Sequence, residues 1–143
     1  MSIAQIIEGR EDRTIISCTP RDTVAVAASL LAEKRIGALP VLDGKGVAGI
    51  FSERDLLYCV AREGAEVLSR AVGEVMTSPA ITIDTKADAL TALSLMTRRR
   101  IRHLPVCDGD RLIGFVSIGD LVKYRMDRIE HEADQMREYI RTA

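Results

Sequence analysis

The sequence is short of aromatic residues: it has two phenylalanines, three tyrosines and no tryptophan. A bound ring system would therefore be held mainly by aliphatic side chains, because few aromatic rings are available for stacking. The net charge is only −1, which argues against nucleic acid as a partner, since domains that bind it are typically basic. No apolar run approaches the roughly 20 residues that a membrane-spanning helix needs, and no signal-peptide pattern is present. We expect a cytoplasmic protein with no membrane segment.

Cysteine and histidine are also scarce. Three cysteines, Cys18, Cys59 and Cys107, form no disulfide-framework spacing, so we expect buried thiols in a reducing compartment. The two histidines, His103 and His131, lie far from each other and from any cysteine pair, so no metal site is expected. No nucleophile–base arrangement is visible, and the chain is therefore expected not to be an enzyme.

What the sequence does contain is a duplication. Shifted by 65 residues, positions 16–56 align with positions 81–121 without a gap, and 15 of these 41 positions are identical. Each copy predicts a short extended segment, a helix (ended at Gly37 in the first copy), two strands joined by an Asp-Gly turn, and a second helix. The fold class is therefore α+β, with a β-α-β-β-α unit that occurs twice. Because one unit leaves an apolar face uncovered, we expect the copies to pack about a pseudo-twofold axis.

The repeat also predicts the domain boundaries. Residues 1–12 form an N-terminal helical segment, 13–63 the first repeat, 64–77 a linker, 78–125 the second repeat and 126–143 a C-terminal helix extension. From the last helix of the second repeat onward, apolar residues are spaced alternately four and three apart: Val122, Met126, Ile129, Ala133, Met136 and Ile140. Such a stripe packs either on its own domain or against a second copy of the chain.

The same phrase follows the second strand of each copy: glycine, two apolar residues, serine, two variable residues and aspartate. Ser-x-x-Asp before an apolar helical run is a capping box, so one explanation is purely structural. The other is binding, because a helix N-terminus attracts phosphate and a carboxylate can accept from both hydroxyls of a ribose. We assign the ribose role to Asp55 and Asp120, with Ser52 and Ser117 beside them. The glycine of the phrase indicates a close backbone approach.

These features resemble the CBS domain, named after cystathionine β-synthase. The resemblance rests on the strand beginnings IGALPV and IRHLPV, the Asp-Gly turn and the Ser-x-x-Asp phrase, each present in both copies. It covers residues 16–121 and implies a stand-alone tandem pair, often called a Bateman module. Such pairs commonly bind adenosyl compounds in two clefts between the copies, usually as sensors, and often form dimers. The resemblance therefore implies a regulatory homodimer that binds AMP, or alternatively ATP, NAD(H) or S-adenosylmethionine.

The resemblance also places the extended segments. By analogy, the segment with Thr14 and Ile16 joins the cleft of the second phrase, and the segment with Thr77 and Ile81 joins the cleft of the first. These segments would offer the base an apolar slot with backbone hydrogen bonds. Ordinary strand packing is an equal alternative for the two isoleucines.

Two cations distinguish the copies. Arg102 and His103 directly precede the Leu-Pro-Val strand, where the resembling family often places phosphate ligands, and a guanidinium group suits phosphate. The first copy has Gly37 and Ala38 at these positions, and Ala38 is a candidate lining residue. Arg54, inside the first phrase, partly compensates for the missing cations. We therefore expect the cleft of the second phrase to favour a phosphorylated nucleoside.

Other functions stay open at this point. The run Arg98–Arg100 is a candidate RNA-binding surface, but it is short and has no aromatic residues interleaved with it. A solvated helix end explains Arg98 and Arg99 more simply. Vestigial clefts would leave a protein-interaction scaffold. The sequence does not name the downstream protein that a regulatory module would act on.

Overall fold

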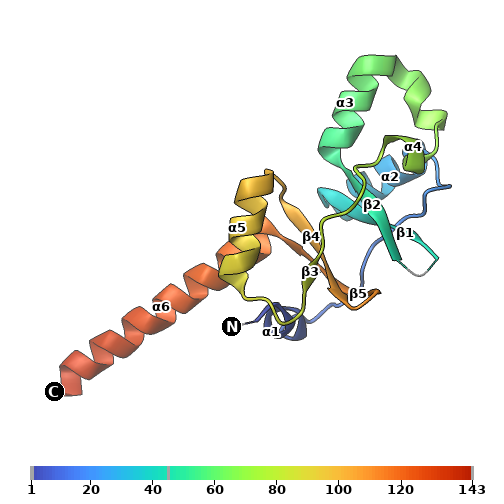
Figure 1. The fold of residues 1–143 in the computed structure, drawn as a ribbon. Coiled ribbons are helices and arrows are strands. Elements are labelled where there is room, and N and C mark those ends of the chain that lie inside the picture. Colours follow the sequence, from blue (N-terminus) through green and yellow to red (C-terminus); the bar gives the residue numbers. More distant parts are fainter. Residues whose placement is uncertain (1, 45, 143) are drawn as a thin grey trace.

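The computed structural model describes residues 2–44 and 46–142, and its elements follow the predicted duplication. The first repeat contains α2 (Val24–Lys34), β1 (Ala38–Asp43), β2 (Gly46–Ser52) and α3 (Glu53–Glu63). The second repeat contains α5 (Ala89–Arg99), β4 (His103–Asp108), β5 (Arg111–Ser117) and α6 (Ile118–Thr142). Each of these elements in the second repeat begins 65 residues after its counterpart. Figure 1 shows the two repeats as neighbouring bodies, with α6 extending outward from the second.

Each repeat is built around an antiparallel hairpin, β1 with β2 and β4 with β5. The register shifts at equivalent places, after Val41 in one hairpin and after Val106 in the other. The hairpin turns place Gly44 and Gly109 at φ of 57° and 61°, a backbone region that glycine adopts without strain. The Asp-Gly turns predicted from the sequence are therefore confirmed in both copies.

The extended segments that lead into the repeats form less regular strand structure than the sequence predicts. In the second repeat, β3 (Ile83–Asp84) pairs in parallel with β4. In the first repeat, the equivalent segment makes a single parallel bridge between Cys18 and Val41. The remaining residues of both segments leave the sheet and run along the boundary between the repeats.

Each hydrophobic core is completed by a helix from outside the predicted repeat. α1 (Ile3–Glu8) covers the second repeat, where Ile3 and Ile7 are buried with Leu104. The segment predicted as a linker contains η1 (Gly64–Ser69) and α4 (Val72–Val75), and Val72 is buried in the core of the first repeat. Because α1 lies on the second repeat, residues 10–16 must cross back to the first.

The glycine of each Ser-x-x-Asp phrase lets the chain pack closely on its strand. A Cβ on Gly49 would lie 2.6 Å from the carbonyl oxygen of Thr77, and a Cβ on Gly114 would collide with Ile7. The predicted close approach is therefore made by the protein itself. The segment after α4 crosses β2, and α1 crosses β5.

Two helices end on arginines in a left-handed conformation. Arg35 after α2 and Arg100 after α5 have φ of 52° and 54°, which costs roughly 1–2 kcal/mol for a residue with a side chain. The prediction that Gly37 ends α2 is therefore wrong. Gly37 instead makes room for the ring of His103, whose Cε1 would lie 3.2 Å from a Cβ at that position.

Only the first turns of the C-terminal helix α6 pack on the second repeat. Leu121 is buried and Tyr124 packs on the core of the second repeat, and the later turns extend away from the rest of the molecule (Figure 1). Within residues 2–44 and 46–142, no helix combines the length and the apolar character that a membrane span requires.

Candidate functional site

Two clefts lie between the repeats, and each joins the Ser-x-x-Asp phrase of one repeat to segments of the other. The first, called here the Asp120 cleft, has a volume of about 370 Å³ and is lined by Arg10, Thr14, Ile15, Ile16, Arg35, Ile36, Gly37, Ala38, His103, Phe115, Ser117 and Asp120. The second, the Asp55 cleft, has a volume of about 310 Å³ and is lined by Gly37, Ile50, Ser52, Glu53, Arg54, Asp55, Tyr58, Thr77, Pro79, Ala80, Ile81, Arg100, Ile101, Arg102 and His103. Most lining positions of one cleft have a counterpart 65 residues away in the other.

The carboxylate of Asp120 is held at the start of α6. The backbone N–H of Ser117 donates to Oδ2 at 2.7 Å, and the hydroxyl of Ser117 accepts from the Asp120 N–H at 3.2 Å. This is the capping box predicted from the sequence. Arg10 adds a partner that the sequence did not reveal: its Nη2 donates to the same Oδ2 at 2.7 Å, and its Nη1 donates to the carbonyl of Phe115 at 2.9 Å.

The carboxylate of Asp55 is held at the start of α3 by a different set of partners. The N–H and hydroxyl of Ser52 donate to Oδ2 at 2.9 and 3.0 Å, and the helix has a complete capping box. The hydroxyl of Thr77 donates to Oδ1 at 2.9 Å. Thr77 is fixed in turn by a pair of backbone hydrogen bonds with Ile50, both of 2.9 Å.

The two carboxylates therefore differ in their spare capacity. An ionised carboxyl group offers about four acceptor sites. Among the described residues, Asp120 accepts two hydrogen bonds and Asp55 accepts three. A vicinal diol brings two donors, so Asp120 can accept both without losing a protein partner. At Asp55 one partner must give way, and the hydroxyl of Thr77 is free to rotate.

The protein itself uses much of each helix N-terminus. The N–H of Glu53 donates to the carbonyl of Gly37 at 3.0 Å, and the N–H of Ile118 donates to the carbonyl of Arg102 at 2.8 Å. The serines of the capping boxes take a further N–H in each helix. Less of either helix N-terminus is left for a phosphate than the sequence predicted, so the side-chain cations matter more.

Arg102 lines the Asp55 cleft, and the expectation that it would stand in the cleft of the second phrase is wrong. Its carbonyl accepts the N–H of Ile118 at the start of α6, beside the Asp120 cleft, but the residue itself lines the Asp55 cleft. The equivalent place in the Asp120 cleft is taken by Gly37. The reason is the exchange between repeats: each cleft combines the phrase of one copy with the strand-leading residues of the other.

The Asp55 cleft consequently has more arginines that are available to a ligand, although Glu53 also lines it. It is lined by Arg54, Arg100 and Arg102, and within the described part of the chain none of these three forms an ion pair. In the Asp120 cleft, Arg10 is already paired with the carboxylate, which leaves Arg35. This distribution is the reverse of the predicted one.

His103 lines both clefts and forms part of the wall between them. Its ring stacks on Phe115, with centroids 5.7 Å apart and planes inclined by 17°. Burial lowers the pKa of His103 below its ordinary value of 6.5, although the charges of Asp120 and Glu53 act in the opposite direction. The ring is therefore neutral at pH 7, with one donor nitrogen and one acceptor nitrogen.

The extended segments lie in the clefts to which the resemblance assigned them. Thr14, Ile16 and Ala38 line the Asp120 cleft, and Thr77 and Ile81 line the Asp55 cleft. Both isoleucines are also partly buried against the hydrophobic cores. The lining role and the packing role therefore coexist at these positions.

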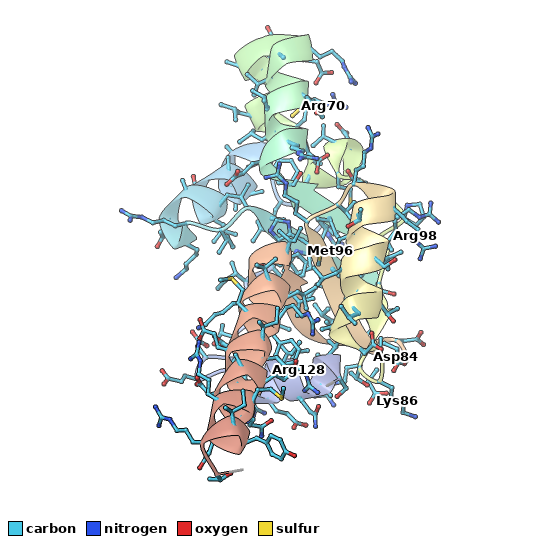
Figure 2. All side chains as sticks on the ribbon, turned by 90° about the vertical axis from the view of Figure 1, so that its left-hand side faces the viewer. Arg70, Asp84, Lys86, Met96, Arg98 and Arg128 are labelled. Atoms are coloured by element: carbon cyan, nitrogen blue, oxygen red, sulfur yellow. The ribbon has the colours of Figure 1, made fainter. Side chains whose placement is uncertain are left out.

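Three arginines that line the clefts were not predicted from the sequence: Arg10, Arg35 and Arg100. Arg10 belongs to a segment with no repeat counterpart of similar chemistry, so no pattern marked it. Arg35 and Arg100 are identical residues at equivalent positions, and that identity was a usable signal. By contrast, Arg98 and Arg99 are exposed and outside both clefts, and Figure 2 shows Arg98 pointing outward from α5.

Among residues 2–44 and 46–142, the possible metal ligands and the cysteines form no further site beside the two clefts. Among the described residues, no three metal-binding side chains lie together. All three cysteines are free thiols; Cys18 and Cys59 are buried as predicted, whereas Cys107 is only partly buried. Burial is the main cause that raises the pKa of Cys18 to about 11, so this thiol is unreactive at neutral pH.

Comparison with known proteins identifies the repeats. The family model of the CBS domain matches residues 11–62 and 72–127. The chain belongs to the CBS domain family. The CBS domain-containing protein CBSX3, mitochondrial, of Arabidopsis thaliana is 36% identical over 134 residues, which cover 90% of this chain and 65% of the relative. Inosine-5'-monophosphate dehydrogenase of Mycobacterium leprae is 40% identical over 111 residues, which cover 76% of this chain and 20% of that enzyme.

Solved CBS structures confirm the predicted fold class, two CBS repeats followed by a C-terminal helix. A protein with CBS domains from Burkholderia ambifaria superimposes with a TM-score of 0.83 at 42% identity, covering 89% of this chain and 95% of that one. The structure of CBSX2 in complex with AMP has a TM-score of 0.74 at 24% identity and covers 88% of this chain and 96% of that one. At this lower identity, the likeness to CBSX2 shows the fold alone.

Proposed function

We propose that this CBS pair is a non-catalytic sensor that binds adenine nucleotides in the clefts between its repeats. The observation that carries the proposal is the placement of a carboxylate at the start of α3 and of α6, each facing segments of the other repeat. A ribose held by either carboxylate touches both repeats at once, so binding stabilises one arrangement of the pair. CBSX2, which has the same fold, is a complex with AMP, and we extend that class of ligand to this chain as part of the proposal.

In the Asp120 cleft, we assign the ribose to Asp120 and Ser117 and the base to the apolar wall of Thr14, Ile16 and Ala38. Asp120 has spare acceptor sites for a diol, as described above. Arg10 lines the same cleft and is held there by its hydrogen bonds to Asp120 and to the Phe115 carbonyl, so its guanidinium is a candidate phosphate ligand. AMP is the ligand that these groups fit best.

In the Asp55 cleft, we assign the ribose to Asp55 and Ser52 and the base to the wall that contains Thr77 and Ile81. Its three free arginines suit a ligand with more phosphate charge, because guanidinium groups bind phosphate oxygens in pairs. ATP or NAD(H) is therefore assigned to this cleft.

We further propose that the protein acts in the cytoplasm as a homodimer that regulates a separate protein. Free thiols such as Cys18 and Cys59 accord with a reducing compartment.

Isothermal titration calorimetry with AMP, ATP, NAD+, S-adenosylmethionine and an RNA oligomer tests the proposal. We expect adenosyl ligands to bind and the RNA not to bind. The matched control ligand is 2',3'-dideoxy-AMP, which lacks the diol and should bind about 10- to 100-fold more weakly than AMP. Equal affinity for AMP and its dideoxy form would refute the ribose assignment, and binding of RNA alone would refute the sensor proposal.

A further inference from the structure

The outer part of α6 carries an apolar stripe that the described chain leaves uncovered. The stripe consists of Val122, Met126, Ile129, Ala133, Met136 and Ile140. The exposed fractions of its five large side chains lie between 43% and 69%. The alternative that the stripe packs on its own domain is therefore wrong.

The stripe faces away from the body of its own chain. Tyr124 packs on the core of the second repeat, and at about 100° per residue it lies almost opposite Val122 and Met126 on the helix. Figure 1 shows the outer turns of α6 extending away from the repeats. A single helix that projects into water gains little stability by itself, so a partner that covers the stripe is needed.

We propose that the stripe is a homodimer interface in which two copies of α6 lie parallel and in register. In heptad notation, Met126, Ala133 and Ile140 occupy a positions, and Val122, Ile129 and Met136 occupy d positions. This is the alternation that forms the seam of a two-stranded coiled coil. All six side chains are then buried against their own copies.

The charges beside the stripe identify a second copy as the occupant. Arg125 and Glu132 occupy g positions, and Glu130 and Arg137 occupy e positions. In a parallel pair, each g residue faces the e residue five positions further along the other helix. Arg125 then meets Glu130 of the partner subunit, and Glu132 meets Arg137 of the partner subunit. The twofold symmetry forms each of these attractive contacts twice.

An antiparallel pair can either bury all six apolar residues or place unlike charges opposite each other, but it cannot do both. An antiparallel pair that buries all six apolar residues places Glu130 beside Glu130 of the partner subunit and Lys123 beside Arg137 of the partner subunit. Shifting the helices until Lys123 meets Glu130 of the partner subunit leaves Met136 and Ile140 beyond the other stripe. Only the parallel pair opposes unlike charges along the full stripe.

Sedimentation velocity across a dilution series of the whole protein tests the interface. Ile129→Glu places a charge in the seam and should raise the dissociation constant of the dimer by at least about tenfold. Gln135→Glu is the matched control, because it adds the same charge to the same helix on the opposite side from the stripe. Circular dichroism should show that the two repeats remain folded in both variants, since both positions are exposed within one chain.

A charge exchange tests the orientation. Glu132→Arg and Arg137→Glu should each weaken self-association, because each places like charges in contact across a parallel pair. Mixing the two variants restores both attractive contacts, so heterodimers should dominate over homodimers in native mass spectrometry. A monomeric wild-type protein, or a dimer unaffected by Ile129→Glu, would overturn the interface. Loss of the dimer without preferential heterodimers would overturn the parallel register.

Discussion

Replacing Gly49 by alanine perturbs the contact that positions the Asp55 cleft. A Cβ at this position would lie 2.6 Å from the carbonyl oxygen of Thr77 and 2.8 Å from Sδ of Met76. The thioether can move aside, but the carbonyl belongs to a backbone segment held by two hydrogen bonds with Ile50. The segment of residues 76–77 must therefore retreat from β2 by several tenths of an ångström.

The size of the effect follows from what this retreat disturbs. Overpacking of a tight contact costs about 1–3 kcal/mol, and each weakened backbone hydrogen bond adds a fraction of its net value of about 1 kcal/mol. We expect the free energy of unfolding to fall by about 2–3 kcal/mol, or roughly 6–12 °C in Tm for a chain of this size. Because Thr77 also donates to Asp55, ligand affinity should fall in the Asp55 cleft and be retained in the Asp120 cleft.

Differential scanning calorimetry of Gly49→Ala beside Gly46→Ala measures this effect. Gly46 lies on the same strand, and a Cβ there would meet no atom within 4 Å. The control variant should melt within about 2 °C of the wild type. If both variants have the same Tm, Gly49 is not needed for the close packing of Thr77 on β2.

Three further predictions concern the clefts. Arg102→Ala should weaken ATP by about 10- to 100-fold in calorimetry and leave adenosine nearly unchanged; equal losses would remove Arg102 from the phosphate role. Because burial lowers the pKa of His103 in the folded state, the unfolded state binds more protons below pH 6.5, and the free energy of unfolding should fall as the pH drops through that value. A His103→Asn variant with the same pH dependence as the wild type would contradict this. Ser117→Ala should lower the free energy of unfolding by about 1 kcal/mol in urea titrations, and an unchanged midpoint would show that its cap contributes nothing.

The elements and both carboxylates were predictable because their signals are local. Apolar periodicity predicts helices and strands, and Ser-x-x-Asp predicts a helix start wherever it occurs. The constant offset of 65 residues then made each assignment in one copy a check on the other. Asp55 and Asp120 could be paired in this way before their surroundings were known.

The division of cations between the clefts was not predictable from those signals. It depends on how the two repeats exchange segments, which is a property of tertiary packing. Because of that exchange, Arg102 lines the Asp55 cleft. Arg10 reaches Asp120 only because α1 packs on the second repeat. Arg35 and Arg100 occupy the left-handed helix ends where glycine is usual, and no local signal in the sequence marks them.

Calorimetric titration of AMP into the wild type, Asp120→Asn and Asp55→Asn tests the central claim most directly. The amide keeps the size of the side chain but removes its charge and one acceptor oxygen, and thermal unfolding of each variant checks that the fold is retained. Our account predicts AMP binding in the Asp120 cleft of the wild type, which Asp120→Asn should weaken by about 10- to 100-fold and Asp55→Asn should leave nearly unchanged. Unchanged AMP affinity in Asp120→Asn would contradict it.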